Sequence, residues 1–161
     1  MLLENSHSWG SGEPVHLHEA IGLLKKTADA DATTASLEIL LVEDDDADAY
    51  LIETALSKIP EVKAVVRARD GVEALTIVDG RKHQIHMAIV DLRMPRKDGF
   101  ELLAELDARI LADFPSVVLS SSRAQLDVYR AGKKGAWKYL TKQSSVARMT
   151  RSLKRVIRAV S

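Results

Sequence analysis

Five short apolar runs divide most of the chain into regular units. They are rich in Ile, Leu and Val, and turn or charged residues bound them. They occupy residues 37–42, 62–68, 85–92, 117–119 and 137–140. Runs of this length with such boundaries are typical of buried β-strands. The pattern therefore predicts five strands.

Amphipathic stretches follow these runs, with apolar residues at helical spacing. The first helix is predicted to begin at Asp46 or Asp48 and to stop at Pro60. Its predicted apolar face comprises Tyr50, Leu51, Ala55, Leu56 and Ile59. The other predicted helices span residues 72–78, 99–111, 124–134 and 144–160, with Asp79-Gly80 ending the second and Phe100, Leu103, Leu106 and Ile110 facing inward on the third.

Strands that alternate with helices pair in parallel through right-handed crossovers. The predicted fold class is therefore α/β, a doubly wound, five-stranded parallel sheet of order 2-1-3-4-5 with five helices. In that order the topological switch point lies between the first and third strands, where ligands bind outside the carboxyl ends.

Acidic residues stand at the ends of the two strands that flank this switch point. Glu43 and Asp44 follow the first strand, and Asp91 follows the third. Carboxylates this close stay ionised only when something neutralises them, and all-oxygen ligands suit Mg²⁺ or Mn²⁺. A carboxylate beside such an ion can attack a phosphoryl group as a nucleophile.

Two further polar residues are predicted at the same edge. Ser120 ends the fourth strand and Lys142 follows the fifth, so they supply a hydroxyl and a cation. One alternative is that residues 43–48 form only a solvated turn before a helix. A calcium loop beginning at Asp44 is rejected, because Ala49 stands where that loop requires Gly and Ala55 where it requires Glu.

Composition narrows the possible functions. The chain has 161 residues, 46% of them apolar, with 23 basic and 23 acidic side chains. Zero net charge argues against nucleic acid and anionic membranes as partners. The absence of cysteine excludes disulfides, thiolate metal sites and cysteine nucleophiles. Neither a secretory signal nor an apolar run of the ~20 residues that span a membrane is evident, so a cytoplasmic location is expected.

Residues 1–36 differ from the rest and are interpreted as an N-terminal extension and linker, whereas residues 37–161 form the folded domain. The extension is acidic and rich in Ser, Gly and His, and a short amphipathic helix is conceivable at residues 16–24. Its histidines at positions 7, 16 and 18 could be metal ligands or a phosphorylation site, but a solvated or weakly docked extension is favoured on composition.

Four motifs carry a resemblance to a known family: ILLVEDD, IVDLRMPRKDG, VVLSSS and GAWKYLTK. Together they resemble the receiver domain of two-component response regulators, which has a flavodoxin-like fold. The resemblance covers residues 37–160. The sequences of the first and last motifs are most similar to those of single-domain regulators that partner bacterial phytochromes.

The resemblance implies a role for each matching residue. Asp91 would be the phosphoacceptor, and Mg²⁺ (or Mn²⁺) would bind Glu43, Asp44, Asp91 and the backbone carbonyl of Arg93. Ser120 and Lys142 would contact the phosphoryl group, while Ser120 and Tyr139 would form the switch. The implied function is a phosphoacceptor switch, not an enzyme beyond slow self-phosphorylation and self-dephosphorylation.

Three positions depart from the family pattern. Gln143 follows Lys142 where the family usually has Pro, Ser120 stands where Thr is commoner, and Glu43 stands where Asp is usual. Gln143 favours the alternative function, a pseudo-receiver that binds partners without using phosphorylation. The complete set of acidic, hydroxyl and lysine residues favours the phosphorylated switch.

No output domain is evident after the last helix, so the expected output is protein–protein contact, phosphotransfer or self-association. From Gln143 onward there are five basic residues and no acidic one, on a helix whose apolar stripe is assigned to the core. The expected partners are a sensor histidine kinase, including the phytochrome type, or a phosphotransfer protein. A homodimer through the fourth helix, fifth strand and fifth helix is also expected, and nucleic acid is not.

Overall fold

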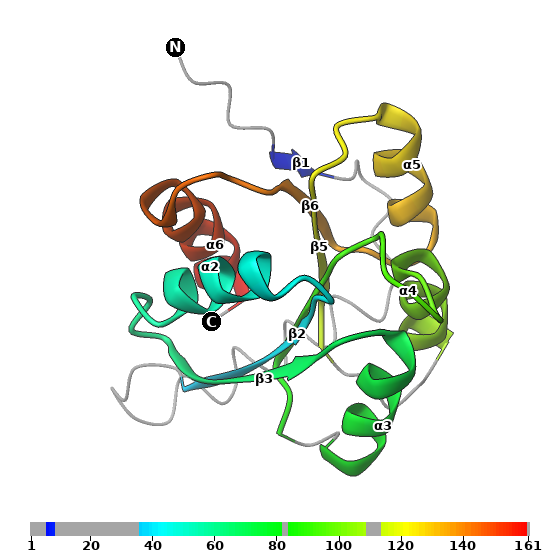
Figure 1. The fold of residues 1–161 in the computed structure, drawn as a ribbon, viewed down its shortest axis with the longest axis horizontal. Helices are drawn as coiled ribbons and strands as arrows, with labels where there is room; N and C mark the ends of the chain where they lie inside the picture. Colours follow the sequence, from blue (N-terminus) through cyan, green and yellow to red (C-terminus); the bar gives the residue numbers. More distant parts are fainter. Residues whose placement is uncertain (1–5, 9–35, 82–83, 109–113, 161) are drawn as a thin grey trace.

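The computed structural model describes residues 6–8, 36–81, 84–108 and 114–160 (Figure 1). The strands are β1 (Ser6–Ser8), β2 (Leu37–Val42), β3 (Val62–Ala68), β4 (Met87–Val90), β5 (Ser116–Ser120) and β6 (Lys138–Thr141). The helices are α2 (Asp46–Leu56), α3 (Gly71–Arg81), α4 (Gly99–Ala108), α5 (Gln125–Lys133) and α6 (Val146–Val160). Among these described helices, none has the length and hydropathy to cross a membrane.

The described strands form one sheet of order β1-β6-β5-β4-β2-β3. The five strands from β2 onward are parallel, which confirms the predicted doubly wound fold and its 2-1-3-4-5 order. The register sets Val42 beside Val90, so that β2 and β4 end at the same edge. The acidic residues that follow them are therefore neighbours.

A sixth strand, β1, was not predicted. Residues Ser6–Ser8 pair antiparallel with β6, and His7 lies opposite Tyr139. This part of the N-terminal extension is thus paired to the sheet edge. The helix considered for residues 16–24 lies outside the described residues.

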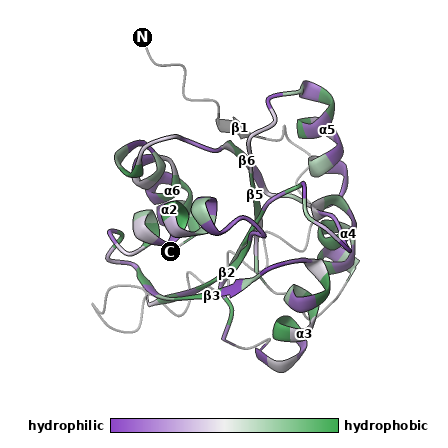
Figure 2. Cartoon of the chain, viewed as in Figure 1, coloured by the Kyte–Doolittle hydropathy of each residue, from purple (hydrophilic) through white to green (hydrophobic). Residues whose placement is uncertain are grey.

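Helices cover both faces of the sheet (Figure 1). Helices α2 and α6 pack on one face, where side chains of β2, β4, β5 and α6 form one apolar cluster. Helices α3, α4 and α5 cover the other face over two smaller clusters. Figure 2 shows hydrophobic residues concentrated along the strands and hydrophilic residues on the outer helix faces. The predicted apolar stripe of the last helix is confirmed, with Met149, Leu153, Val156, Ile157 and Val160 buried.

The predicted inner face of the first helix was partly wrong. Tyr50 is 73% exposed, whereas Ala49 and Ile52 are buried against the sheet. The buried residues Ala49, Ile52 and Leu56 recur at three- or four-residue spacing and define the inner face, which leaves Tyr50 on the outer side of the helix. The helix begins after the N-cap Asp45, which accepts a hydrogen bond from Asp48 N at 2.8 Å.

The second helix also extends further than predicted. Asp79 and Gly80 lie within α3, which continues to Arg81. A glycine in the last turn of a helix costs only ~1 kcal/mol relative to alanine, so packing of the preceding turns outweighs it. The stretch around Ile110, predicted to end the third helix, lies outside the described residues.

The loop between β4 and α4 folds tightly back onto the end of β4. Gly99 N donates a hydrogen bond to Leu92 O at 3.0 Å. A β-carbon on Gly99 would clash with the backbone oxygen of Asp91 and would lie 2.6 Å from Leu92 Cα. Glycine is therefore required for α4 to begin directly beneath Asp91.

We expect Gly99→Ala to lower the free energy of unfolding by about 2–3 kcal/mol, because the clash is with backbone that has little room to move. Urea denaturation measures this. The matched control is Gly80→Ala, where a β-carbon meets nothing within 4 Å. It should stabilise the protein by about 0.5–1 kcal/mol through helix propensity. Equal effects of the two substitutions would contradict the close approach at Gly99.

Candidate functional site

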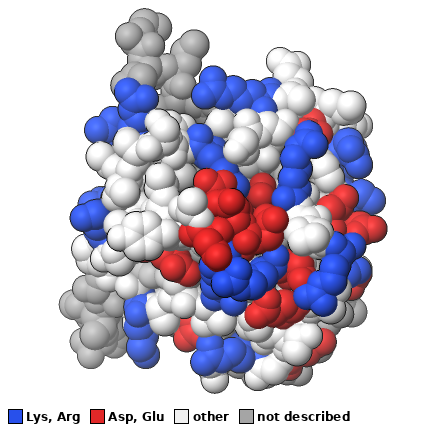
Figure 3. All heavy atoms as spheres, viewed as in Figure 1, with Lys and Arg blue, Asp and Glu red and all other residues white. Residues whose placement is uncertain are grey.

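Three carboxylates converge at the carboxyl edge of the sheet. Glu43 and Asp44 follow β2 and Asp91 follows β4, and each offers an oxygen within 4.8 Å of the others. Glu43 is 1% exposed and Asp91 is also buried, while Asp44 is more open. Figure 3 shows acidic side chains gathered in one central patch, bordered by basic ones.

Lys142 supplies the cation of this cluster. From the end of β6 its Nζ lies 2.7 Å from Glu43 Oε2 and 3.3 Å from Asp91 Oδ2. All described peptide bonds are trans, including the one between Lys142 and Gln143. The departure at Gln143 therefore does not keep the ammonium from the carboxylates.

Asp48 is a site residue that sequence reasoning missed. Its Oδ2 accepts a hydrogen bond from Lys142 Nζ at 2.7 Å. The sequence interpretation used Asp46 and Asp48 as acids that start a helix and as positions of the rejected calcium loop. Side chains that lie two residues apart on a helix point in nearly opposite directions. Asp46 therefore does not face Lys142 with Asp48, and it pairs with Arg67 at 2.7 Å and with Arg69. That spacing was the available signal that one of the two acids faces the site.

Burial and the charge of Lys142 shift the pKa values of the acidic groups in opposite directions. Burial raises the pKa of Glu43 to about 7, although the hydrogen bond and charge of Lys142 lower it. Burial also raises the pKa of Asp91, again opposed by Lys142. For Lys142, burial lowers the pKa, but hydrogen bonds to Asp48 and Glu43 outweigh it and the net direction is upward. The ammonium thus stays charged, and the buried carboxylates share one cation.

The donor set suits a hard divalent cation. It consists of carboxylate oxygens that lie close together, the chemistry preferred by Mg²⁺ and Mn²⁺. Among the described residues, the contact of Glu43 Oε2 is with the ammonium of Lys142 at 2.7 Å, and a carboxylate oxygen has two lone pairs. That oxygen therefore keeps free lone-pair capacity, and the residues present fit a metal ion.

Ser120 and Tyr139 lie together behind Lys142, and both are buried. The backbone N of Lys142 donates to Ser120 O at 2.9 Å. Ser120 Oγ accepts a hydrogen bond from Ser122 N at 3.2 Å, and the Tyr139 hydroxyl donates to Ser122 O at 2.9 Å. Burial raises the pKa of Tyr139, so its hydroxyl remains a donor. The two predicted switch residues are therefore linked through Ser122.

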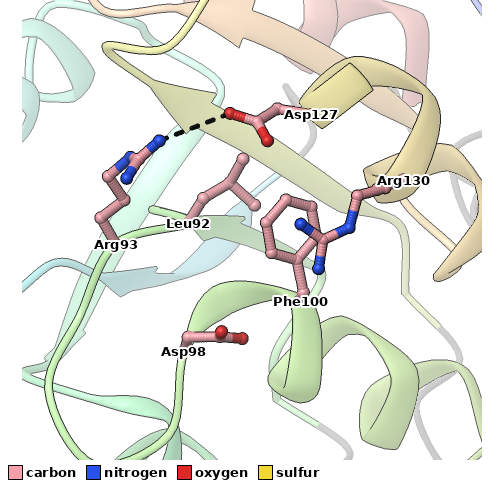
Figure 4. Close-up of a pocket in the computed structure, with 6 residues that line it drawn as sticks. All are labelled: Leu92, Arg93, Asp98, Phe100, Asp127 and Arg130. Atoms are coloured by element: carbon pink, nitrogen blue, oxygen red, sulfur yellow. Dashed lines mark ion pairs between the residues drawn. The ribbon is translucent and has the colours of Figure 1, made fainter. Parts of the chain in front are cut away.

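Arg93 lies in the loop after β4, two residues beyond Asp91. Its guanidinium lies 3.7 Å from Asp127 Oδ2 on α5. Both line a pocket of about 250 Å³ beside the site, with Leu92, Asp98, Phe100 and Arg130 (Figure 4). Sequence reasoning placed Arg93 at the site for its backbone carbonyl alone and did not identify Asp127.

Comparison with known proteins identifies the class that this fold and site define. The response regulator receiver domain family matches residues 39–154. The chain belongs to this family, and the resemblance seen in its motifs is confirmed.

Individual relatives of this chain are also regulatory proteins and response regulators. The probable methanogenesis regulatory protein FilR2 of Methanothrix harundinacea is 32% identical over 123 residues, covering 73% of this chain and 79% of FilR2. Response regulator Rcp1 of Synechocystis is 32% identical over 114 residues, covering 67% of this chain and 78% of Rcp1. In other relatives the match is a small part of a longer protein, such as 14% of the rice response regulator-like protein PRR73.

Solved structures share the fold. The phosphorylated cyanobacterial phytochrome response regulator RcpA superposes with a TM-score of 0.68 at 31% identity, over 76% of this chain and 91% of that one. The Mn²⁺-bound form of Rcp1 superposes with a TM-score of 0.64 at 28% identity, over 74% of this chain and 91% of that one.

Replacing Lys142 with Met tests the charge balance. We expect Lys142→Met to lower the free energy of unfolding in metal-free buffer at pH 7 by about 3 kcal/mol, because it leaves buried carboxylates without a cation. Without the ammonium the folded-state pKa values of Glu43 and Asp91 rise further. A carboxyl group whose pKa is higher in the folded state than in the unfolded state favours folding at low pH and loses that contribution as pH rises. The difference in unfolding free energy between Lys142→Met and the wild type should therefore be smaller at pH 5 than at pH 7.

Urea denaturation at both pH values measures this effect. The exposed Lys134 provides the control substitution Lys134→Met, which should change stability little at either pH. Adding Glu43→Gln to Lys142→Met should recover part of the loss. A deficit that is equal at pH 5 and pH 7 would contradict the electrostatic cause.

Proposed function

We propose that this protein is a response regulator that accepts a phosphoryl group on Asp91, with Mg²⁺, and thereby switches a protein-binding surface. The observation that carries the proposal is the contact of Lys142 Nζ with both Glu43 and Asp91 at the open switch point of the sheet. The proposed nucleophile Asp91, the proposed metal-binding acids and Lys142 thus lie close together. Gln143, the main feature that favoured a pseudo-receiver, leaves this arrangement intact.

In the proposed reaction, one Asp91 oxygen attacks the phosphorus of a phosphohistidine. The new P–O bond forms as the P–N bond breaks, and the imidazole leaves with the nitrogen lone pair and takes up a proton. Glu43, Asp44, Asp91 and the carbonyl of Arg93 would hold Mg²⁺, which neutralises charge on the phosphoryl oxygens. Lys142 would exchange its contact with Asp91 for one with a phosphoryl oxygen.

The switch would follow from the added charge, about −1.5 to −2. Lys142 and the Ser120 hydroxyl are attracted to it, and movement of Ser120 opens space beside the ring of Tyr139. A shift of Tyr139 changes the surface of β6 and its neighbouring helices. Phosphorylation thus biases two arrangements of the same elements.

We further propose a sensor histidine kinase or phosphotransfer protein as the phosphoryl donor. The similarity to Rcp1 and to the phytochrome response regulator RcpA supports a phytochrome-type kinase. A homodimer through α5, β6 and α6 would use the exposed Leu126 and Tyr129 of α5. A cytoplasmic location fits these partners.

The first test is phosphorylation by acetyl phosphate. In the presence of Mg²⁺, the intact mass of the wild type should rise by one phosphoryl group, and that of Asp91→Asn should not. Removal of Mg²⁺ with EDTA should abolish the gain. Asp46→Asn is the matched control, because Asp46 lies outside the convergent cluster and pairs with Arg67 and Arg69. Equal gains by wild type and Asp91→Asn would exclude Asp91 as the acceptor.

Metal binding is tested by stability. A ligand that binds only the folded state at ten times its dissociation constant stabilises it by about 1.4 kcal/mol. Mg²⁺ should therefore raise the midpoint of thermal unfolding of the wild type. The rise should be lost in Glu43→Gln and Asp44→Asn and retained in Asp46→Asn. A rise of equal size in all four proteins would show that Mg²⁺ acts elsewhere.

A further inference from the structure

Asp127 connects two parts of the site that lie on different loops. Its Oδ2 accepts a hydrogen bond from Ser122 Oγ at 2.5 Å and lies 3.7 Å from a guanidinium nitrogen of Arg93. Arg93 belongs to the loop that carries the phosphoacceptor, and Ser122 belongs to the loop after β5. One carboxylate at the start of α5 therefore bridges both loops.

The surroundings show which part of this bridge is fixed. The Asp127 side chain is 14% exposed, whereas that of Arg93 is 79% exposed. On the other wall of the pocket Arg130 stacks over Phe100, 4.2 Å from the ring centroid. Figure 4 shows Arg93 extending past Leu92 toward Asp127. The arginine is thus the solvated, easily moved member of the pair.

Ser122 transmits the position of Asp127 to the proposed switch residues. Its backbone N donates to Ser120 Oγ, and its carbonyl accepts from the Tyr139 hydroxyl. A shift of Ser122 therefore alters a hydrogen bond to each of them. The described contacts run without a gap from Arg93 through Asp127 and Ser122 to Tyr139.

We propose that Asp127 is a positioning residue that holds Ser122, and with it Ser120 and Tyr139, in their present arrangement until Arg93 leaves. This inference rests on the proposed phosphorylation of Asp91. A phosphoryl group there places a dianion two residues from Arg93, and guanidinium groups bind phosphoryl oxygens strongly. An exposed ion pair at 3.7 Å is weak and loses that competition.

When Arg93 leaves, the negative charge of Asp127 loses the cation beside it. A mostly buried carboxylate without a cation gains by turning toward water. That movement breaks its hydrogen bond to Ser122 Oγ and loosens the loop after β5, although Ser122 Oγ still accepts from Ala124 N. Arg93 would thus couple the charge on Asp91 to Tyr139 along a route separate from Lys142.

The test uses the full chain, with beryllofluoride and Mg²⁺ as the phosphoryl mimic. Asp127→Asn keeps the shape of the side chain but removes its charge. We expect the apparent dissociation constant for beryllofluoride to fall about three- to tenfold, the size expected for loss of one exposed ion pair and one charged hydrogen bond. Glu38→Gln is the control, since it breaks the Arg81–Glu38 pair near the start of β2.

A second measurement separates positioning from general stability. The chain has three tyrosines, and Tyr50 and Tyr129 are exposed whereas Tyr139 is buried. The NMR ring signals of Tyr139, assigned with Tyr139→Phe, should move in unliganded Asp127→Asn toward their position in the beryllofluoride-saturated wild type. Should Asp127→Asn fail to fold, Ser122→Ala removes the hydrogen bond that Asp127→Asn weakens and should move the signal in the same direction.

Arg93 is tested by a double-mutant cycle. If Arg93 acts through Asp127, Asp127→Asn should have a much smaller effect on affinity in the Arg93→Ala background. An undiminished effect there would overturn the role of Arg93. Wild-type affinity and an unmoved Tyr139 signal in Asp127→Asn would overturn the role of Asp127. A wild type that binds no beryllofluoride would instead count against the proposed phosphorylation.

Discussion

The contact of one ammonium group with several buried carboxylates is the interaction on which the site depends. Glu43 and Asp91 lie in a crevice where burial alone raises the pKa of both. Lys142 opposes that rise, and it also bonds to Asp48 on α2. A single positive charge does not balance this much negative charge in a place of low dielectric. The imbalance makes the crevice attractive to a divalent cation.

The parallel sheet makes this concentration of charge possible. Strands β2, β4 and β6 all end at the same edge, so that Glu43, Asp91 and Lys142 meet there although they are far apart in the sequence. The apolar clusters on both faces hold these strand ends in place and leave them little freedom to separate. Gly99 adds a local condition, because only a residue without a β-carbon lets α4 begin against the backbone of Asp91. The cost of gathering like charges is thus offset by packing elsewhere in the domain.

Sequence reasoning predicted the five parallel strands and the convergence of Glu43, Asp44 and Asp91, because apolar runs and strand ends are local features. It missed the outward position of Tyr50 because it counted this aromatic ring as core, whereas Ala49 and Ile52 complete the buried face of α2. It missed β1, whose Ser-His-Ser sequence has no apolar pattern and is paired only through β6. Asp127 was also missed, because an acid in the first turn of a helix is already explained by the helix dipole. Its contacts arise only from the tertiary placement of two loops.

The position of β1 constrains how the proposed switch surface is used. Without β1, the backbone of β6 would be the open edge of the sheet, and open edges attract further strands. In the structure, residues Ser6–Ser8 pair with that edge directly opposite Tyr139. A partner that added a strand would have to displace β1 and lose its hydrogen bonds before gaining new ones. A partner that contacts Leu126 and Tyr129 on α5 meets side chains that are already exposed. Since β1 occupies the β6 edge of the sheet, the geometry favours recognition of the proposed switch surface through helix side chains over addition of a strand beside β6.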